Sequence, residues 1–143
     1  MNNDLMFSSK SDEYSTPIDF FEKLNAEFHF TLDPCCTEET AKCKRYFTKE
    51  DDGLNRDWQG ETVFVNPPYS NISQWVEKAW KEGRKEGTTV VMLIPSRTDT
   101  KYFHNYIYHR SEIRFVKGRL KFGNSKNAAP FPSMVVIFRG KEK

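Results

Sequence analysis

The stretch that most constrains the fold of this chain is a short apolar run that stops at two prolines, Thr62-Val63-Phe64-Val65-Asn66-Pro67-Pro68-Tyr69. Its β-branched and aromatic residues predict a buried strand over residues 62–65. Neither proline has an N–H group to donate to a strand ladder, and the first proline holds Asn66 in an extended conformation. The run therefore predicts a rigid turn that presents an amide side chain and an aromatic ring directly after a buried strand.

The groups in this turn are suited to binding a planar amine. The exocyclic amine of adenine is a weak nucleophile, because its lone pair is delocalised into the ring. The side-chain oxygen of Asn66 and the carbonyl oxygen of Pro67 can accept its two N–H bonds, while Tyr69 stacks on the base. We therefore predict that the catalytic residues are Asn66, Pro67, Pro68 and Tyr69, with a plain polyproline-like turn as the structural alternative.

Other motifs accompany this turn in order along the chain. They are Ser15-Thr16-Pro17 with Phe20-Phe21, Thr31-Leu32-Asp33-Pro34-Cys35-Cys36, Asp52-Gly53-Leu54 with Trp58, Trp75, Met92-Leu93-Ile94-Pro95, Thr98-Asp99-Thr100 and Gly118-Arg119-Leu120-Lys121-Phe122. The ordered set resembles the bacteriophage family of DNA adenine-N6 methyltransferases, from about Tyr14 to Phe138. The resemblance implies methyl transfer from S-adenosylmethionine (SAM) to DNA, in the cytoplasm of a bacterial host.

The resemblance also implies which residues bind the cofactor. They are Thr16, Pro17, Asp33, Pro34, Asp52 and Asn66, with Asp51 as a further candidate beside Asp52. The chain departs from the usual pattern after Asp33-Pro34, because Cys35, Cys36 and Thr37 stand where glycines are common. Each position has a structural alternative: a helix start at Thr16-Pro17, a turn at Asp33, and a solvated acidic loop at residues 51–52.

Strands alternate with helices along the chain. We expect helices at residues 18–27, 38–44, 72–86 and 99–108, and strands at residues 28–32, 45–48, 62–65, 88–94, 112–122 (interrupted) and 134–139. This order predicts an α/β fold, an abbreviated Rossmann-like sheet that is mostly parallel with an antiparallel edge strand. Asp33 and Asn66 both follow strands, so we expect them at one crevice at the carboxyl ends of the strands.

A chain of 143 residues predicts one domain, here a polar tail at residues 1–13 followed by a methyltransferase domain at residues 14–143. The segment contains no apolar run long enough to span a membrane and no signal peptide. It also leaves no room for a separate target-recognition domain. We therefore expect loops to read the DNA sequence, above all the loop at residues 123–133.

Charge is distributed unevenly along the chain. Residues 1–70 carry 7 Lys/Arg and 14 Asp/Glu, a net −7, whereas residues 71–143 carry 15 and 6, a net +9. The basic half predicts contact with a polyanion. The densest basic segment contains Arg110, Arg114, Lys117, Arg119, Lys121 and Lys126. We predict Arg119, Lys121 and Lys126 as DNA-binding residues, with a solvated face as the alternative.

The three cysteines, Cys35, Cys36 and Cys43, are predicted to be packing thiols rather than ligands, and no metal site is expected, since no C-x-x-C pair occurs. Two other functions remain open on sequence alone. One is methylation of RNA bases or of protein glutamine, because Asn-Pro-Pro-Tyr serves those reactions too. The other is a non-catalytic DNA-binding module derived from this fold. Oligomeric state is not predictable from the sequence.

Overall fold

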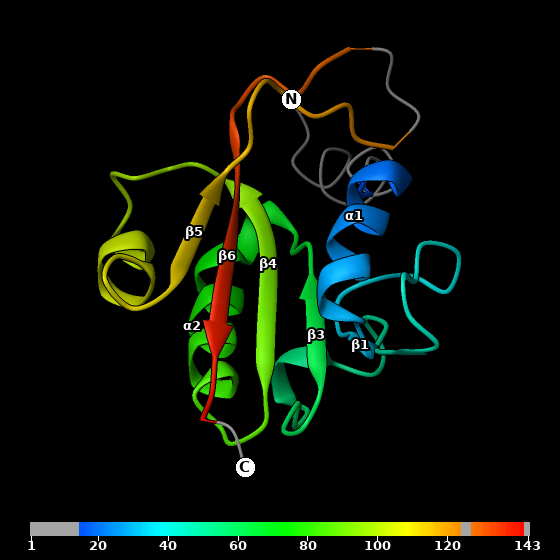
Figure 1. Cartoon of the computed structure of the whole chain (residues 1–143). Helices are drawn as coiled ribbons and strands as arrows, with labels where there is room; N and C mark the ends of the chain where they lie inside the picture. The colour runs from blue at the N-terminus through cyan, green and yellow to red at the C-terminus, as the bar shows by residue number, and fades with distance from the viewer. Residues whose placement is uncertain (1–14, 124–126, 142–143) are drawn as a thin grey trace.

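The fold is a six-stranded sheet with a helix on each face, seen in a computed structural model that describes residues 15–123 and 127–141 (Figure 1). The strand order is β2-β1-β3-β4-β6-β5. The strands are β1 (Leu32–Asp33), β2 (Arg45–Tyr46), β3 (Thr62–Val65), β4 (Thr89–Pro95), β5 (Glu112–Phe115) and β6 (Ser133–Arg139). The helices are α1 (Ile18–Phe28), α2 (Ile72–Gly83), two 3-10 turns, η3 (Gly53–Asn55) and η4 (Tyr69–Asn71), and a π-helix, η5 (Phe103–Ile107).

The direction of the strands confirms the predicted fold class. β1 is parallel to both β2 and β3, and β3 is parallel to β4. β6 is antiparallel to β4 along its whole length and also to β5, which forms the edge. The abbreviated side of the sheet is the β1–β2 side, where each strand has two residues. The protein is therefore an α/β domain with a Rossmann-like, mostly parallel sheet and an antiparallel edge.

The two faces of the sheet bury separate clusters of side chains. Alternate residues of β3, β4 and β6 point to opposite faces, as the pleat of a strand requires. One set, including Val63, Met92 and Val136, packs with Trp75, Val76 and Ala79 of α2. The other set, including Phe64, Leu93 and Val135, packs with Phe21 and Leu24 of α1. This division decides which side chains at the strand ends can meet, because each end residue faces either α1 or α2.

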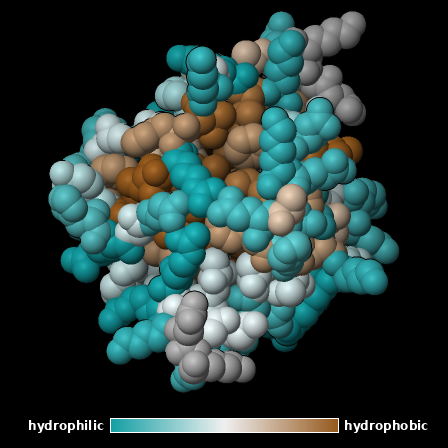
Figure 2. Space-filling model, in the orientation of Figure 1, coloured by the Kyte–Doolittle hydropathy of each residue, from teal (hydrophilic) through white to brown (hydrophobic). Residues whose placement is uncertain are grey.

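The α1 face is completed by long charged side chains rather than by a second helix. Arg114 of β5 donates to both carboxylate oxygens of Glu27 in α1, at 2.7 and 2.8 Å, and its guanidinium lies over the Phe28 ring. Figure 2 shows hydrophilic side chains lying across an apolar area in the middle of this face. A bidentate pair of this kind ties the edge strand to α1, although the residues are 87 positions apart.

Several predicted elements differ from those observed. Residues 38–44 form a turn rather than a helix, because Thr37 and Thr40 bind each other through side chain and backbone and so compete with helical bonding. The helix predicted at residues 72–86 ends at Gly83, and Gly87 lies in the turn beyond it. The strand predicted at residues 28–32 is reduced to Leu32–Asp33, because α1 continues to Phe28 and ends at His29 in the left-handed region.

The C-terminal half has two further differences. The helix predicted at residues 99–108 is helical only from residue 101, and most of it is the π-helix η5. The interrupted strand at residues 112–122 stops at Phe115, and residues 119–122 belong to the irregular connection between β5 and β6. Leu120 and Phe122 pack there on the α1 face of the sheet. Within the described part of the chain, no helix is long and apolar enough to cross a membrane.

Candidate active site

Asn66 lies directly beyond the last residue of β3, at the carboxyl-end edge of the sheet. Its side-chain Nδ2 donates to the hydroxyl of Thr16 at 3.1 Å, across 50 positions of sequence. Thr16 is 3% exposed and immediately precedes Pro17, the N-cap of α1. Nδ2 of the amide therefore faces the start of α1. Two residues of the predicted site are thus in direct contact.

The prolines hold the rest of the turn as predicted. Pro67 is buried, and Pro68 is the extended N-cap residue of η4, which begins at Tyr69. The Tyr69 ring meets the Phe131 ring edge to face, with centroids 5.4 Å apart. Phe131 belongs to the β5–β6 connection, so the motif after β3 contacts a segment from the far end of the chain.

The β5–β6 connection crosses the carboxyl-end edge of the sheet towards the start of α1, along the top of Figure 1. The amide of Gly123 donates to the carbonyl of Ser15 at 2.9 Å, and Ala129 N–H bonds Leu120 at 2.8 Å. At its far end the carbonyl of Pro132 accepts from the amide of Ser96. The connection is therefore attached on both sides of the Asn66 turn, and it brings the predicted recognition loop to the predicted active site.

Asp33 is the second predicted cofactor residue at this edge. It is 3% exposed and ends β1, so it lies within the strand rather than just past it. Its Oδ1 accepts from Cys35 N–H at 3.3 Å and its Oδ2 from Lys42 N–H at 3.0 Å. Burial raises the pKa of this carboxyl to about 6, against the opposing effect of these two hydrogen bonds. Asp33 thus holds the loop at residues 35–42 in place of the missing glycine-rich turn.

Pro34 and Asp52 are the other predicted cofactor residues on the β1 side of the sheet. Pro34 is buried against Gly53, where an added Cβ would lie 2.1 Å from the Pro34 carbonyl oxygen. The carbonyl of Gly53 in turn accepts from the indole N–H of the buried Trp58 at 3.0 Å. Asp52 precedes η3 in the left-handed region and is exposed, with its carboxylate bonded to Asn55. Close packing therefore requires glycine at position 53 and places Asp52 at the surface.

The predicted DNA-binding residues lie on the β5–β6 connection. Arg119 and Lys121 are both exposed there, next to the buried Phe122. Lys126 lies outside the described residues. Arg114, which belongs to the same basic segment, is instead committed to the ion pair with Glu27. Arg119 and Lys121 lie beside Phe122, whose ring is 6.0 Å from that of Phe131, so these two exposed side chains are close in the chain to a residue that packs on the Tyr69 partner.

The cysteines have the environment of packing thiols. All three are free and half-buried, and Cys35 packs against the core on the α2 face. Burial raises the pKa of Cys43 to about 12 and raises the pKa values of Cys35 and Cys36 further still. Thiols in this state are protonated at neutral pH and are poor nucleophiles. Among residues 15–123 and 127–141, no group of three His, Cys, Asp or Glu side chains is placed to hold a metal ion.

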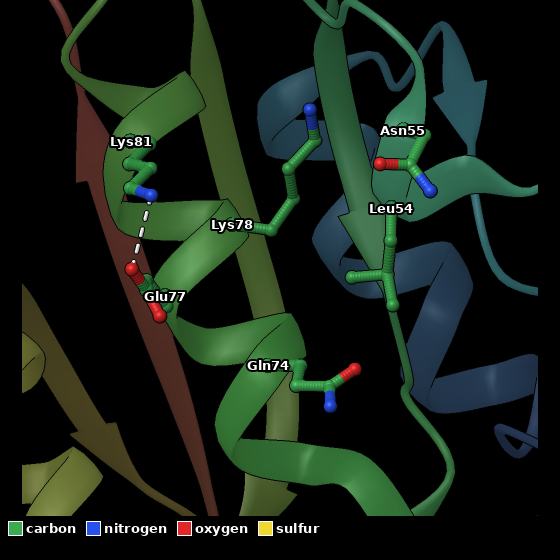
Figure 3. Close-up of a pocket in the computed structure, with 6 residues that line it drawn as sticks. All are labelled: Leu54, Asn55, Gln74, Glu77, Lys78 and Lys81. Atoms are coloured by element: carbon green, nitrogen blue, oxygen red, sulfur yellow. Dashed lines mark ion pairs between the residues drawn. The ribbon is translucent and has the colours of Figure 1, made fainter.

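A pocket of about 260 Å³ opens elsewhere, between α2 and η3 (Figure 3). Its lining is Leu54, Asn55, Gln74, Glu77, Lys78 and Lys81. Lys81 pairs with Glu77, and Lys78 donates to the carbonyl of Arg56 at 2.6 Å. The charged groups of this pocket thus serve the packing of η3 on α2, and none of the predicted site residues lines it.

Sequence reasoning missed the contributions of Phe131 and Ser133. Phe131 stood inside the loop predicted at residues 123–133, but an aromatic residue in a loop does not reveal which ring it meets. Ser133 was placed at the end of that loop, whereas it is the first residue of β6 and is 1% exposed. The signal was weak in each case, because both placements depend on strand pairing between distant segments.

The Rossmann-like sheet and an Asn-Pro-Pro-Tyr turn at the carboxyl end of a central strand define the class of amino-methylating enzymes. A family model described as DNA N-6-adenine-methyltransferase (Dam) matches residues 5–143, and the chain belongs to this family. The chain is 33% identical to the DNA N-6-adenine-methyltransferase of Haemophilus phage HP1, over 93% of this chain and 82% of that protein.

Two other relatives match shorter stretches. The DNA N-6-adenine-methyltransferase of Escherichia phage T1 is 28% identical over 76% of this chain and 46% of its own length. The putative methyltransferase YfdM of Escherichia coli K12 is 37% identical over 41% of this chain and 71% of its own length. The resemblance noted from the motifs is confirmed by these matches.

Proposed function

We propose that this protein transfers a methyl group from SAM to the N6 amine of adenine in DNA. The target base would be flipped out of the stack to reach the turn at Asn66, since inside a duplex one N6–H is used in base pairing and the neighbouring bases block the face of the amine that a methyl donor must approach. The side-chain oxygen of Asn66 and the carbonyl oxygen of Pro67 accept hydrogen bonds from the two N6–H groups, and Tyr69 stacks on the ring of the base. Catalysis then rests on position and on hydrogen-bond acceptors fixed before the base arrives.

The observation that carries this proposal is the bond between Asn66 and Thr16. An amide that is free to rotate would present Oδ1 or Nδ2 to the base at random, and Nδ2 would repel an amine. In the structure Nδ2 donates to the buried Thr16 hydroxyl, an arrangement that turns the donor end of the amide towards α1. The site is therefore organised as an acceptor, which is what an amine donor requires and what a carbonyl substrate would not tolerate.

The residues next to Asn66 fit a cationic methyl donor. When bound, SAM supplies an electrophilic methyl group on a sulfonium cation, together with an ammonium group and a ribose diol. Asp33 ends β1 beside β3, and each of its oxygens can accept a further hydrogen bond beyond the one it already receives. The exposed Asp52 is a candidate for the ribose hydroxyls. We therefore assign the cofactor to the β1 side of Asn66, where Thr16, Pro17, Asp33 and Pro34 would hold it.

The distribution of charge along the sheet supports this arrangement. β2, β1 and β3 come from the half of the chain with net charge −7, and β4, β6 and β5 come from the half with net charge +9. Asn66 stands at the boundary between the two. A cation is favoured on one side of the boundary and a polyanion on the other, so we place the DNA over β4, β6 and the β5–β6 connection.

The deciding experiment is methyl transfer by the purified protein to DNA, RNA and a glutamine-containing protein, with N6-methyladenine measured by mass spectrometry. We expect transfer to DNA, and we expect Asn66→Ala to reduce it by about 100-fold or more while SAM affinity and melting temperature stay close to wild type. The matched control is Asn105→Ala, an exposed asparagine on η5, which should retain full activity.

Each alternative function has its own outcome in this assay. Methyl transfer to RNA or to glutamine but not to DNA would show that the substrate is RNA or protein rather than DNA. Calorimetry that detects no SAM binding, with DNA binding intact, would favour a non-catalytic module. A purified Asn66→Ala protein with near wild-type turnover would remove the Asn-Pro-Pro-Tyr turn from the reaction.

A further inference from the structure

Ser133 carries a buried hydroxyl whose hydrogen-bonding capacity is unused within the described part of the chain. The residue is 1% exposed, and its Oγ has no hydrogen-bond partner among the described residues. Most buried side-chain polar atoms in proteins do have a partner, because leaving a buried hydroxyl unsatisfied destabilises the folded state. A hydroxyl kept at this cost next to a functional site points to a ligand that satisfies it.

Strand register places Ser133 on the same face of the sheet as Asn66. In β6, Ser133 and Val135 point to the α1 face, and Val135 belongs to the cluster that packs on α1. In β3, Phe64 and Asn66 point to the same face, as the bond from Asn66 to Thr16 also requires. Ser133 pairs with Pro95 at the carboxyl end of β4, which lies between β3 and β6.

The separation of these two residues suits a purine. Their strands are two positions apart in the sheet, and Ser133 lies two residues beyond the level of Asn66, so their backbones are about 12 Å apart. Two hydrogen bonds of about 2.9 Å leave about 6 Å, which the two side chains share with the roughly 2–3 Å between the amine of adenine and an adjacent ring nitrogen. One base can therefore reach both residues.

The location of Ser133 also identifies which substrate it faces. It lies on the β6 side of Asn66, opposite the Asp33 side to which we assign the cofactor, and the Phe131 that meets Tyr69 is two residues before it. In-line displacement aligns N6, the methyl carbon and the sulfonium sulfur, and the ring of the base lies off that line, so with SAM on the β1 side of Asn66 the β6 side is left to the base. A group on the β6 side is therefore positioned to touch the base rather than SAM.

We propose that the Ser133 hydroxyl donates a hydrogen bond to a ring nitrogen of the flipped adenine and so helps to select this base. The inference rests on the proposed function and adds a specificity residue to it. Asn66 and Pro67 recognise an amine, which adenine shares with cytosine and guanine. Ser133 supplies a donor for a ring nitrogen beside that amine, and this second contact is what fixes the base in register.

The test compares Ser133→Ala with Ser96→Ala in the full chain. Ser96 follows β4, faces α2 by the same alternation of side chains, and also has a buried Oγ without a described partner. We expect Ser133→Ala to lower kcat/KM for DNA by about 10- to 100-fold, with unchanged SAM affinity and an equal or higher melting temperature. Ser96→Ala should keep wild-type kcat/KM, because its hydroxyl faces the other side of the sheet.

Substrates with an altered base separate a contact with adenine from an indirect effect. DNA is prepared with 7-deazaadenine or 1-deazaadenine at the target position, which removes one ring nitrogen each. With one of these two altered bases, kcat/KM of wild type should fall to that of Ser133→Ala, and kcat/KM of the variant should not fall further. This loss of additivity is the signature of a direct hydrogen bond.

Three results would overturn the inference. They are a Ser133→Ala protein within twofold of wild type, equal losses for Ser96→Ala and Ser133→Ala, and fully additive losses on both altered bases. If wild type methylates adenine in DNA and any of these occurs, the inference alone fails. If wild type methylates no DNA, the proposed function fails together with it.

Discussion

At the scale of single residues, Asp33 has the most unusual chemistry in the described part of the protein. A carboxyl with a folded-state pKa of about 6 titrates in the range where enzymes are assayed. Its ordinary value is 3.8, so between about pH 4 and pH 6 the unfolded chain releases a proton that the folded chain keeps. The free energy of unfolding contributed by Asp33 is then fully present below pH 4 and falls as the pH rises to 6.

We predict that Asp33→Asn removes this dependence. The free energy of unfolding of wild type, relative to that of the variant, should fall by on the order of 2–3 kcal/mol between pH 4 and pH 7. Urea unfolding of both proteins at four pH values measures it. Carboxylates with lowered pKa values, such as Glu27 and Asp57, affect both proteins alike and cancel in the difference. Parallel curves would show that Asp33 does not titrate in this range.

The same variant tests the cofactor assignment. If Asp33 contacts SAM as well as its own loop, Asp33→Asn should weaken SAM binding more than DNA binding at pH 7. A variant with altered pH dependence of stability but unchanged SAM affinity would leave Asp33 with a structural role only.

The residues of the site could be predicted individually, but their contacts could not. Asn66 is identified by the prolines that follow it, since neither proline can donate to a strand ladder and the strand must end there. Nothing near Thr16 in sequence reveals that its hydroxyl binds Asn66, because the pairing depends on how α1 packs across β3. The unused hydroxyl of Ser133 was invisible for the same reason, since burial at a strand end depends on tertiary packing.

At the scale of elements, the β5–β6 connection joins the charges that we propose to face DNA to the candidate active site. Its described parts pack through Phe122 and Ala129 on the α1 face of the sheet and leave Arg119 and Lys121 exposed. Because this connection is held on both sides of the Asn66 turn, the position of a bound duplex can affect the position of the base at Asn66. Its charges should therefore govern DNA affinity without a direct part in methyl transfer.

We predict that changing Arg119 and Lys121 together to alanine weakens binding to all DNA sequences alike. Each phosphate contact contributes about 0.9 to the slope of log affinity against log salt, so losing two should reduce that slope by about 2. Binding measured by fluorescence anisotropy across a salt series gives the slope. The matched control is the Lys44/Lys81 double alanine variant, which removes two exposed lysines far from this connection. A full slope in the Arg119/Lys121 variant would mean that the basic segment is only a solvated surface.

The elements that were predicted well are those with strong local signals. β3 and β4 are fixed by apolar runs and by prolines at their ends, and α1 and α2 by apolar faces at helical spacing. The errors fall where local signals compete. Thr37 and Thr40 convert an expected helix into a turn, and β1 keeps two residues because α1 runs on to Phe28. Where these elements end depends on hydrogen bonds between side chains and backbone and on packing, and neither can be predicted from the spacing of apolar residues.

At the scale of the whole molecule, the described strands pass the boundary between β3 and β4 only once in the order of the chain. Every described strand on one side of the β3–β4 boundary comes from residues 32–65, and every described strand on the other side comes from residues 89–139. The crossing is made by α2, and the turn that follows it is exposed at Glu86 and Gly87. The two halves are therefore contiguous in sequence as well as in space.

We predict that the protein can be divided at this turn and reassembled. Fragments 1–86 and 87–143, co-expressed, should restore N6-methyladenine in host DNA, while either fragment alone should leave none. Parallel pairing of β3 with β4 and the packing of α2 on β4 supply the interface. The control carries Asn66→Ala in the first fragment and should assemble without methylating. Co-expression that yields no methylation, although both fragments accumulate, would contradict the prediction.

A protein divided in this way could report contacts between two other proteins as DNA methylation. On the contacts that we propose, the fragment with Asn66 and the fragment with Ser133 would each supply part of the site for one base, so neither alone should methylate DNA. If the two fragments are fused to proteins that bind each other, and their own affinity is weakened, each meeting would be stored as a methylated adenine. Because its strands pass the β3–β4 boundary only once, this small domain is a candidate for a two-fragment reporter whose signal, methylated adenine, is read by DNA sequencing.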